Sequence, residues 1–373
     1  MMKTMKTKKI KILEVCPFSA GVCGVWARVL AESREFVKLG HEVRVFSSDV
    51  EKGNQNLAKC EEDIGSIAIR RFKSRSSIIS KNVNLFDFTG EFLEYKPDIV
   101  ITHLLHPHSF KALELCKEHG IPCYLVTHAP FNVQRGFILN AATSVYSRFK
   151  IKPKLHYFTK IIAITKWEMP YLLKLGISRE KIIYIPNGLP EEFFRQKKAR
   201  CEKGKDVLFL GRIAPVKDIE TLLMTARALP EINFSVVGGY EKDYLDKLER
   251  IISKENLKNV RIFPPVYDLK KKIKLIDEHK LFVLPSIREA MPQVLLEALA
   301  RGRLVISSDT DGGKEIIKNG KNGLLFEIGN YKDLARLIKK NIKGNKLMQR
   351  NAIVDAKRYA WSKLIKFYIM LFK

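Results

Sequence analysis

The chain has 373 residues, 46% of them hydrophobic and 29% charged, and carries a formal net charge of +27 at pH 7. These values describe a soluble globular protein that is long enough for two domains and has no apolar run long enough to span a bilayer. The basic stretch at residues 1–9 precedes an apolar segment that contains Lys11 and Glu14, so we predict a first strand there and no signal peptide.

The excess of positive charge suits three kinds of partner: nucleic acid, an anionic membrane surface or an anionic substrate. A lysine-rich composition shared by a whole proteome explains the charge without any partner. No zinc finger, RNP motif or clear helix-turn-helix accompanies the charge, and we expect no nucleic-acid partner. The six cysteines show no C-x-x-C spacing, which predicts reduced thiols in a cytoplasmic protein.

In the first half, short apolar runs alternate with amphipathic helical stretches, a pattern that indicates parallel sheets. The first predicted strand leads through a loop with Gly21 and Gly24 into a helix at 25–39, and a strand at 41–46 completes a βαβ unit. Either glycine could approach a ligand, and a helix-capping role for Gly24 is the alternative. Further strands are predicted at 67–72, 98–103, 123–128, 160–164 and 182–185.

A polar and charged stretch at 195–205 shows no periodicity, and we place a linker there. The second half then repeats the alternation of strand and helix. Strands are predicted at 207–210, 233–237, 260–263, 281–284 and 304–307, and helices at 218–229, 241–254 and 292–301.

Two glutamates, Glu289 and Glu297, lie eight residues apart at the junction after the strand 281–284. Glu289 falls in the loop, and Glu297 falls just over one turn into a helix that Pro292 starts and Gly302 ends. Ligands of open α/β sheets bind at this edge, where a helix amino terminus offers N–H groups to a phosphate. Two carboxylates beside such a site suit the hydroxyls of a sugar and a ribose.

A second segment, Gly211 to Asp218, follows the strand 207–210 and contains Arg212 and Lys217. One arginine and one lysine at a strand end can neutralise a diphosphate, the arginine by its planar fork and the lysine as a point charge. A surface helix with two solvated glutamates and an ordinary basic turn is the alternative interpretation of the two segments.

Together the two segments resemble the paired-glutamate motif and the glycine-arginine…lysine donor loop of glycosyltransferase family 4. The resemblance covers nearly the whole chain and implies an α/β protein with two Rossmann-like domains facing across a cleft, the GT-B fold. It implies an acceptor-side domain at 1–194, a donor-binding domain at 195–355 and a helix at 356–373 that crosses back to the first domain. It also implies a retaining enzyme that moves a sugar from a nucleotide-diphosphate-sugar to a glycan, lipid-linked or small-molecule acceptor, with no bound cofactor and no essential metal.

By the same resemblance, Arg212 and Lys217 hold the diphosphate, Glu297 binds the ribose and Glu289 holds hydroxyls of the donor sugar. His128 lies beside the reacting sugar, and a strand-end histidine with a structural hydrogen bond is the alternative. No separate nucleophile is evident, so the leaving phosphate is expected to accept the acceptor's proton. Further donor-binding residues implied are Gly24, Gly211, Met291, Pro292, Gln293 and Val294. In the last four, the backbone N–H groups of Met291, Gln293 and Val294 are the donors, and Pro292, which has no N–H, lies at the helix start.

Three histidines, His103, His106 and His108, form a dense group that could bind a metal in principle. No carboxylate or cysteine lies beside them in the sequence, and we expect no metal site. His103, at a strand end, is the better candidate for a ligand-facing residue. The run Asp309-Thr310-Asp311 has the letters of a metal motif from a different glycosyltransferase fold, and we interpret it as a coincidence.

Basic residues cluster at two places in the first half, with aromatic residues between the charges of the second cluster. Such a surface suits an anionic leaflet or a polyanionic lipid-linked acceptor, so we expect a peripheral membrane contact; a solvated basic face is the alternative. The residues are Arg70, Arg71, Lys73, Arg75, Arg148, Lys150, Lys152 and Lys154. Two other functions stay open, a nucleotide-sugar-binding relative such as an epimerase and a basic nucleic-acid-binding protein.

Overall fold

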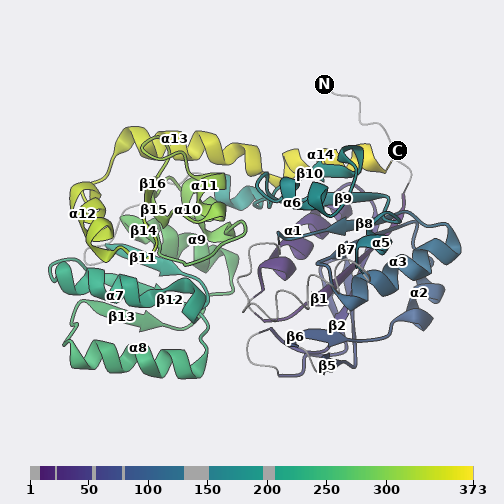
Figure 1. Ribbon diagram of the computed structural model, residues 1–373, viewed down its shortest axis with the longest axis horizontal. Coiled ribbons are helices and arrows are strands. Elements are labelled where there is room, and N and C mark those ends of the chain that lie inside the picture. Colours follow the sequence, from purple (N-terminus) through teal and green to yellow (C-terminus); the bar gives the residue numbers. More distant parts are fainter. Residues whose placement is uncertain are drawn as a thin grey trace. The chain divides into compact units, whose positions relative to one another are not determined.

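The structure is a computed structural model that describes residues 9–21, 23–52, 56–77, 80–129, 151–195 and 206–372 (Figure 1). It divides into two compact units. Unit 1 comprises Met1–Asn187 and Leu364–Lys373, and unit 2 comprises Gly188–Lys363. The predicted linker lies outside the described residues from 196 to 205.

Unit 1 is built on a sheet that has eight strands among the described residues, in the order β10-β9-β8-β7-β1-β2-β4-β3. Neighbouring strands are parallel except β3 and β4, which pair antiparallel at the edge. The strands are β1 (Lys11–Phe18), β2 (Glu42–Ser48), β3 (Glu61–Ile64), β4 (Ile67–Phe72), β7 (Ile99–His103), β8 (Cys123–Val126), β9 (Lys160–Ala163) and β10 (Ile182–Tyr184). A separate hairpin pairs β5 (Arg75–Ser77) with β6 (Ser80–Leu85).

In the described part of unit 1, a set of helices connects successive parallel strands. They are α1 (Gly24–Lys38), α2 (Thr89–Tyr95), α3 (Pro107–His119), α5 (Lys152–Leu155), α6 (Met169–Lys174) and the 3-10 turn η2 (Arg179–Lys181). Helix α3 illustrates how the sequence sets these bounds. Pro107 occupies its first position, and Gly120, with φ +66°, ends it in the left-handed conformation that a helix C-terminus favours.

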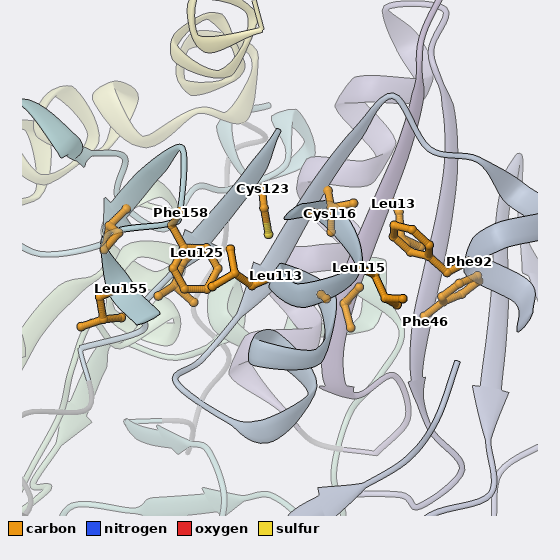
Figure 2. Close-up of a cluster of buried hydrophobic side chains, with 14 of the residues drawn as sticks. Leu13, Phe46, Phe92, Leu113, Leu115, Cys116, Cys123, Leu125, Leu155 and Phe158 are labelled. Carbon is orange, nitrogen blue, oxygen red and sulfur yellow. The ribbon is translucent and has the colours of Figure 1, made fainter. Parts of the chain in front are cut away.

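A continuous apolar core supports the sheet of unit 1. Strand β1 is almost fully buried, as expected for a central strand with both faces covered. Figure 2 shows the buried side chains that pack together, among them Leu13, Phe46, Leu113, Leu125 and Phe158. The core therefore fixes the positions of β1, β7 and β8, whose carboxyl ends carry the polar residues described below.

Helix α14 (Trp361–Leu371) supplies the later segment of unit 1. The Tyr368 ring packs edge-on against Phe36 of α1, with ring centroids 5.4 Å apart. The hydroxyl of Tyr124 donates a hydrogen bond to the carbonyl oxygen of Leu371 at 2.8 Å. Residues distant in sequence thus complete the packing of α1 and β8.

Unit 2 contains a parallel sheet with six described strands, in the order β13-β12-β11-β14-β15-β16. The strands are β11 (Val207–Leu210), β12 (Phe234–Val237), β13 (Val260–Phe263), β14 (Leu281–Leu284), β15 (Leu304–Ser308) and β16 (Leu324–Phe326). Its helices are α7 (Ile219–Ala228), α8 (Lys242–Lys254), α9 (Leu269–Glu278), α10 (Gln293–Ala300), α11 (Asp311–Ile316), α12 (Tyr331–Asn341) and α13 (Lys346–Ala356), with 3-10 turns η3 (Glu191–Phe194), η4 (Pro215–Lys217) and η5 (Lys357–Tyr359).

Each of the two large sheets has a point where the strand order reverses. In unit 2 the chain moves outward from β11 to β12 and then returns to the other side of β11 with β14. In unit 1 the equivalent reversal lies between β1 and β7. Open α/β sheets bind ligands at the carboxyl ends of the strands beside such a point.

The predicted α/β class, with two Rossmann-like parallel sheets, is confirmed. The described part of the chain contains no helix with both the length and the apolar character needed to cross a membrane.

Candidate functional site

The loop after β11 is held in place by the end of β12. Gly238 lies so close to this loop that a Cβ atom added to it would be 1.7 Å from the carbonyl oxygen of Gly211. The backbone N–H of Ile213 donates to the carbonyl of Gly239 at 2.7 Å, and that of Glu241 returns a bond to Ile213 at 3.0 Å. The segment that carries Arg212 and Lys217 is therefore positioned by backbone contacts that leave no room for a side chain.

The structure brings Lys217 and Glu289 together. Lys217 ends η4, and its Nζ donates to Oε1 of Glu289, which also accepts a 2.6 Å hydrogen bond from the hydroxyl of Ser286. The N–H of Ile287 donates to the carbonyl of Val216 at 3.0 Å and ties the two loops to each other. The Lys217 side chain is 17% exposed and that of Glu289 10%, so this ion pair is largely shielded from water.

Glu297 lies on α10 and is 5% exposed. Its Oε1 accepts a 2.8 Å bond from Nζ of Lys272 on α9, a residue that sequence reasoning missed. Its Oε2 is buried and has no hydrogen-bond partner among the described residues. An unpaired buried carboxylate oxygen is costly, and a hydroxyl donor would satisfy it. Lys272 lies in a helix rich in lysines, and nothing in the sequence pattern distinguishes it from its neighbours.

Arg212 is placed differently from the other predicted donor residues. Its Nη1 donates to Oε1 of Glu241 at 2.6 Å, and the side chain is 38% exposed. The contacts of the described residues do not join Arg212 to Glu289 or Glu297. The guanidinium has five N–H donors, and the bond to Glu241 uses one of them.

The segment from Met291 to Val294 forms the start of α10. The helix begins at Gln293, and Pro292 is its cap residue, with φ −72° and ψ 109°. Sequence reasoning placed Pro292 one position further into the helix, a difference within the usual uncertainty of helix ends. The N–H of Gly312, in the first turn of α11, donates to the carbonyl of Glu289 at 3.1 Å. The start of α11 thus holds the backbone of the paired-glutamate segment through this hydrogen bond.

The two glycines of the first loop in unit 1 have separate roles. Gly21 has φ +77°, and a Cβ there would lie 2.4 Å from the carbonyl oxygen of Lys52, so this position needs glycine. Gly24 is the first residue of α1, and no heavy atom lies within 4 Å of where its Cβ would be. Of the two glycines, Gly24 is the one with open space beside it. Its role in donor binding stays a prediction.

His128 follows β8 in a strained backbone conformation. Its φ is +58° and that of Ala129 is +49°, both in the left-handed region that non-glycine residues rarely adopt. The ring contacts His103 at the end of β7, with 3.0 Å between Nε2 of His128 and Nδ1 of His103. The structure therefore brings together the two histidines that sequence reasoning proposed separately.

Behind His103 lies a buried group of charged residues. Nε2 of His103 is 2.7 Å from Oε2 of Glu14, and Nε of Arg28 is 3.2 Å from Oε2 of Glu32. All four side chains are fully buried. Burial, together with the nearby Glu32 carboxylate, raises the pKa of Glu14 well above its usual value, and Arg28 only partly opposes this. Burial lowers the pKa values of His103 and His128 well below the usual value, so both rings are neutral.

Sequence reasoning missed Glu14, Arg28 and Glu32 as functional candidates. The available signal was a glutamate in the middle of an otherwise apolar strand. Among the described residues, one group has ligand atoms of metal-binding type within 4.8 Å of one another, and it consists of Glu14, Glu32 and His103. His106 and His108 are not in that group. Nε2 of His108 donates instead to the carbonyl of His103 at 2.8 Å.

The positive charge of the basic cluster on β4 is partly neutralised by β3, the strand that pairs with β4 at the sheet edge. Arg70 pairs with Glu61, and Arg71 with Glu62 at 2.6 Å, because the acidic strand β3 lies alongside. Arg71 is also buried, and its Nε donates to the hydroxyl of Ser19 at 2.8 Å. The expectation that Arg71 belongs to a surface patch is therefore wrong, since its donors are used inside the protein.

The remaining members of the two basic clusters have different positions. Lys73 and Arg75 are exposed. Lys152 and Lys154 lie in α5, where Lys154 pairs with Glu114 at 2.7 Å. The other two predicted members, Arg148 and Lys150, lie outside the described residues.

Two family models match the chain. The model for Glycosyltransferase Family 4 matches residues 22–193, and that for Glycosyl transferases group 1 matches residues 190–358. A relative from Campylobacter jejuni, N,N'-diacetylbacillosaminyl-diphospho-undecaprenol alpha-1,3-N-acetylgalactosaminyltransferase, is 27% identical over 263 residues, which is 65% of this chain and 67% of the relative.

Solved structures are similar over almost the full length. Sucrose-phosphate synthase from Thermosynechococcus elongatus superposes with a TM-score of 0.76 at 16% identity, covering 98% of this chain and 99% of the other. HepE from Anabaena, solved in complex with UDP and glucose, superposes with a TM-score of 0.73 at 15% identity, covering 97% and 98%. At this level of identity, the two likenesses concern the fold.

Proposed function

Because the chain belongs to glycosyltransferase family 4, we propose that unit 2 binds the nucleotide-sugar donor through Lys217, Glu289 and Glu297. The family resemblance predicted from the two motifs is confirmed by the family models, and the chain is a retaining glycosyltransferase that uses nucleotide-sugar donors. The match favours sugar transfer over the epimerase and nucleic-acid alternatives.

The buried Oε2 of Glu297 is the observation that carries the proposed donor site. With Oε1 held by Lys272, this oxygen is an acceptor in a fixed direction. Two adjacent ribose hydroxyls are donors of matching chemistry, and their binding would satisfy the buried atom. The start of α10, one turn away, offers backbone N–H groups and the positive end of the helix dipole to the diphosphate.

Lys217 and Arg212 supply positive charge for the diphosphate in this proposal. Stabilising the charge that develops on a leaving group is commonly the largest single catalytic contribution. Lys217 is already oriented by Glu289. Arg212 binds the phosphate through its planar guanidinium, because a dianionic ligand attracts this group more strongly than the one exposed carboxylate of Glu241 does.

Glu289 contacts the sugar itself in this proposal, and the role of His128 beside the reacting sugar is carried over from the family resemblance. Oε1 of Glu289 is engaged by Lys217 and Ser286, which leaves its other oxygen for a sugar hydroxyl. In the transfer step the bond from the anomeric carbon to the phosphate oxygen breaks as the bond to the acceptor oxygen forms on the same face. The leaving diphosphate takes the acceptor's proton, so no protein nucleophile is required.

For the donor we propose a uridine diphosphate sugar, and for the acceptor a lipid-linked molecule. Support for the first comes from HepE, whose solved complex contains UDP and glucose. Support for the second comes from the Campylobacter relative, whose named acceptor is linked to undecaprenol through a diphosphate. The exposed residues Lys73 and Arg75, with Lys152 and Lys154, would then approach the anionic membrane surface.

A thermal-shift screen tests the donor site. The pure protein is heated with UDP, GDP or ADP, and with the sugar conjugates of each. A ligand that binds only the folded protein raises the melting temperature. We expect the largest rise with UDP and one UDP-sugar, and no rise in Glu297→Ala. The absence of a rise with every nucleotide would contradict the proposed site.

A further inference from the structure

Unit 1 buries a connected polar network directly behind His128. Glu14 comes from β1, Arg28 and Glu32 from α1, and His103 from β7, and each is fully buried. The protein interior tolerates such charges only when they are neutralised and hydrogen-bonded. The distribution of partners within the network decides which group carries a proton.

Burial raises the pKa of Glu32 as well, and its Oε1 has no hydrogen-bond partner among the described residues, but Arg28 and Tyr368 oppose this rise. Oε2 of Glu32 is 3.2 Å from Nε of Arg28 and accepts a 2.9 Å hydrogen bond from the hydroxyl of Tyr368. Other donors of Arg28 bond to the carbonyl of Ile185 at 3.2 Å and to Oδ1 of Asn187 at 3.1 Å. Arg28 and Glu32 thus form a mutually neutralised pair.

Glu14 lacks partners of this kind. Its Oε2 contacts His103, a neutral ring, and its Oε1 is buried without a hydrogen-bond partner among the described residues. The one cation in the network, Arg28, is bonded to Glu32. Arg28 would offset the charge of an ionised Glu14 only partly, whereas the carboxylic acid costs far less to bury.

The proton on Glu14 determines the tautomer of His103, and His103 in turn determines that of His128. A protonated Oε2 donates to Nε2 of His103, so the neutral ring of His103 carries its hydrogen on Nδ1. That hydrogen donates to Nε2 of His128, 3.0 Å away, and the neutral ring of His128 in turn carries its hydrogen on Nδ1. With Glu14 ionised, every hydrogen reverses and Nδ1 of His128 becomes an acceptor.

We propose that Glu14 is a positioning residue which, through His103, holds His128 as the Nδ1–H tautomer, so that His128 presents an N–H donor to an oxygen of the sugar. This rests on the proposed contact between His128 and the donor sugar. The left-handed backbone at His128 and Ala129 agrees with it, because such strain is retained where a side chain must be aimed.

Other titratable or charged groups surround the network on every side. The histidines are neutral, and Arg28, which is paired with Glu32, opposes the rise in the pKa of Glu14 only partly. Burial holds the pKa of His106 at about 4 and that of His108 at about 3. Besides Arg28 and Glu32 of the network itself, the groups are Cys16 on β1, His106 and His108 at the start of α3, His128 after β8 and Tyr368 on α14.

A bound cation at Glu14, Glu32 and His103 is the competing explanation of the same geometry. It would require Glu14 to be ionised and Nε2 of His103 to carry no hydrogen. Arg28 already provides the positive charge beside Glu32. Both explanations leave Nε2 of His103 without a hydrogen and give the two rings the same tautomers. They differ in the proton on Glu14 and in the presence of the ion, so elemental analysis separates them.

Nuclear magnetic resonance of the protein labelled with ¹⁵N-histidine reports the tautomers without any substrate. His128→Gln and His103→Gln assign the two rings. We expect Nδ1–H on both rings in the wild type and in Glu14→Gln, whose amide N–H replaces the acid proton. In Glu14→Met, which cannot donate, we expect the two rings to lose this preference. An Nε2–H tautomer of His128 in the wild type, an unchanged spectrum in Glu14→Met, or stoichiometric metal by elemental analysis would each overturn the proposal.

The rate of sugar transfer gives the second readout. Loss of one hydrogen bond to the reacting sugar predicts a kcat about tenfold lower in Glu14→Met, with donor affinity unchanged. In the wild type kcat should fall at alkaline pH as Glu14 loses its proton, and in Glu14→Gln this fall should be absent. Correct tautomers with an unchanged kcat in Glu14→Met would contradict the catalytic part of the proposal. Failure of nucleotide binding in the thermal-shift screen would instead contradict the proposed function, and the tautomer measurement would be unaffected.

Discussion

Lys272 binds one oxygen of Glu297 at 2.8 Å, and the second oxygen of the same carboxylate is buried without a hydrogen-bond partner among the described residues. The two residues come from α9 and α10, the helices that precede and follow β14 in the chain. The lysine fixes the rotation of the carboxylate, so the second oxygen points in one direction before any ligand arrives. A receptor group oriented in advance loses less entropy on binding.

Replacing Lys272 with Ala should therefore weaken donor binding. We expect the dissociation constant of the nucleotide-sugar to rise about tenfold, the effect of one hydrogen bond to a charged group, with kcat little changed. Isothermal titration calorimetry measures the affinity. The exposed Lys270, on the same helix, provides the control. An equal loss in Lys270→Ala would mean that general positive charge, and not the Glu297 contact, is responsible.

Lys217→Ala and Glu289→Ala should each remove most transfer activity, because one loses charge on the diphosphate and the other loses a sugar contact. We expect kcat to fall about 100-fold or more in both variants. Initial-rate kinetics with the preferred donor test this, and circular dichroism checks that the fold is intact. Arg336→Ala, which breaks an exposed ion pair with Asp333, should keep the wild-type rate. A wild-type rate in either site variant would remove that residue from the proposed site.

Gly238→Ala should disturb the donor loop through the backbone. The new Cβ would lie 1.7 Å from the carbonyl oxygen of Gly211, so the loop must move for the chain to fold. We expect a melting temperature several degrees lower, for a cost of about 1–3 kcal/mol, together with loss of donor binding. Gly90→Ala is the control, because Gly90 lies in helix α2 with open space around it and alanine favours helix. A Gly238→Ala protein with normal stability and donor affinity would contradict the close approach.

Stability should depend on pH through Glu14. The folded-state pKa of this carboxyl is raised above its ordinary value of 4.5. Between that value and the raised pKa the unfolded chain releases the proton while the folded chain keeps it, so wild-type stability falls as pH increases. Glu14→Gln removes this dependence. Its advantage over the wild type should be small near pH 4.5 and grow by at most about 1.4 kcal/mol per pH unit above it. Thermal melts across this range would contradict us if the difference between the two proteins were constant.

The two basic clusters of unit 1 should bind anionic vesicles. Each basic residue near such a surface contributes about 1 kcal/mol, so changing Lys73, Arg75, Lys152 and Lys154 to Glu should abolish sedimentation with the vesicles at low salt. The matched control changes four exposed lysines of unit 2 to Glu: Lys339, Lys340, Lys343 and Lys346. Equal loss of binding in the control would attribute the effect to net charge alone.

The positions of the donor loop and the paired glutamates at strand ends could be predicted from the sequence. Both follow apolar strands, whose ends periodicity locates well. Their pairing with Lys272 was not predictable, since it depends on how α9 packs beside α10. Similarly, Glu14, His103 and His128 converge because β1, β7 and β8 are neighbours in the sheet. Strand order is a property of the whole fold, and no local pattern contains it.

The error at Arg71 has a similar cause. Strand β3 is short and acidic and has no alternation of apolar and polar residues, so nothing in its sequence predicts a strand. Once it pairs antiparallel with β4, its glutamates neutralise two arginines of the expected patch. A cluster of like charges in a sequence can therefore be cancelled by a segment that only the fold brings beside it.

The contact between Tyr368 and Arg28 spans 340 positions of the chain, and it has a consequence for how the protein is made. A ribosome delivers α1 early and α14 only after all of unit 2. Until then the Arg28–Glu32 pair lacks the hydroxyl of Tyr368, and the face of Phe36 that receives its ring is uncovered. The first half of the nascent chain therefore lacks these contacts while the second half is synthesised. During this stage its exposed apolar surface is open to aggregation and to chaperones.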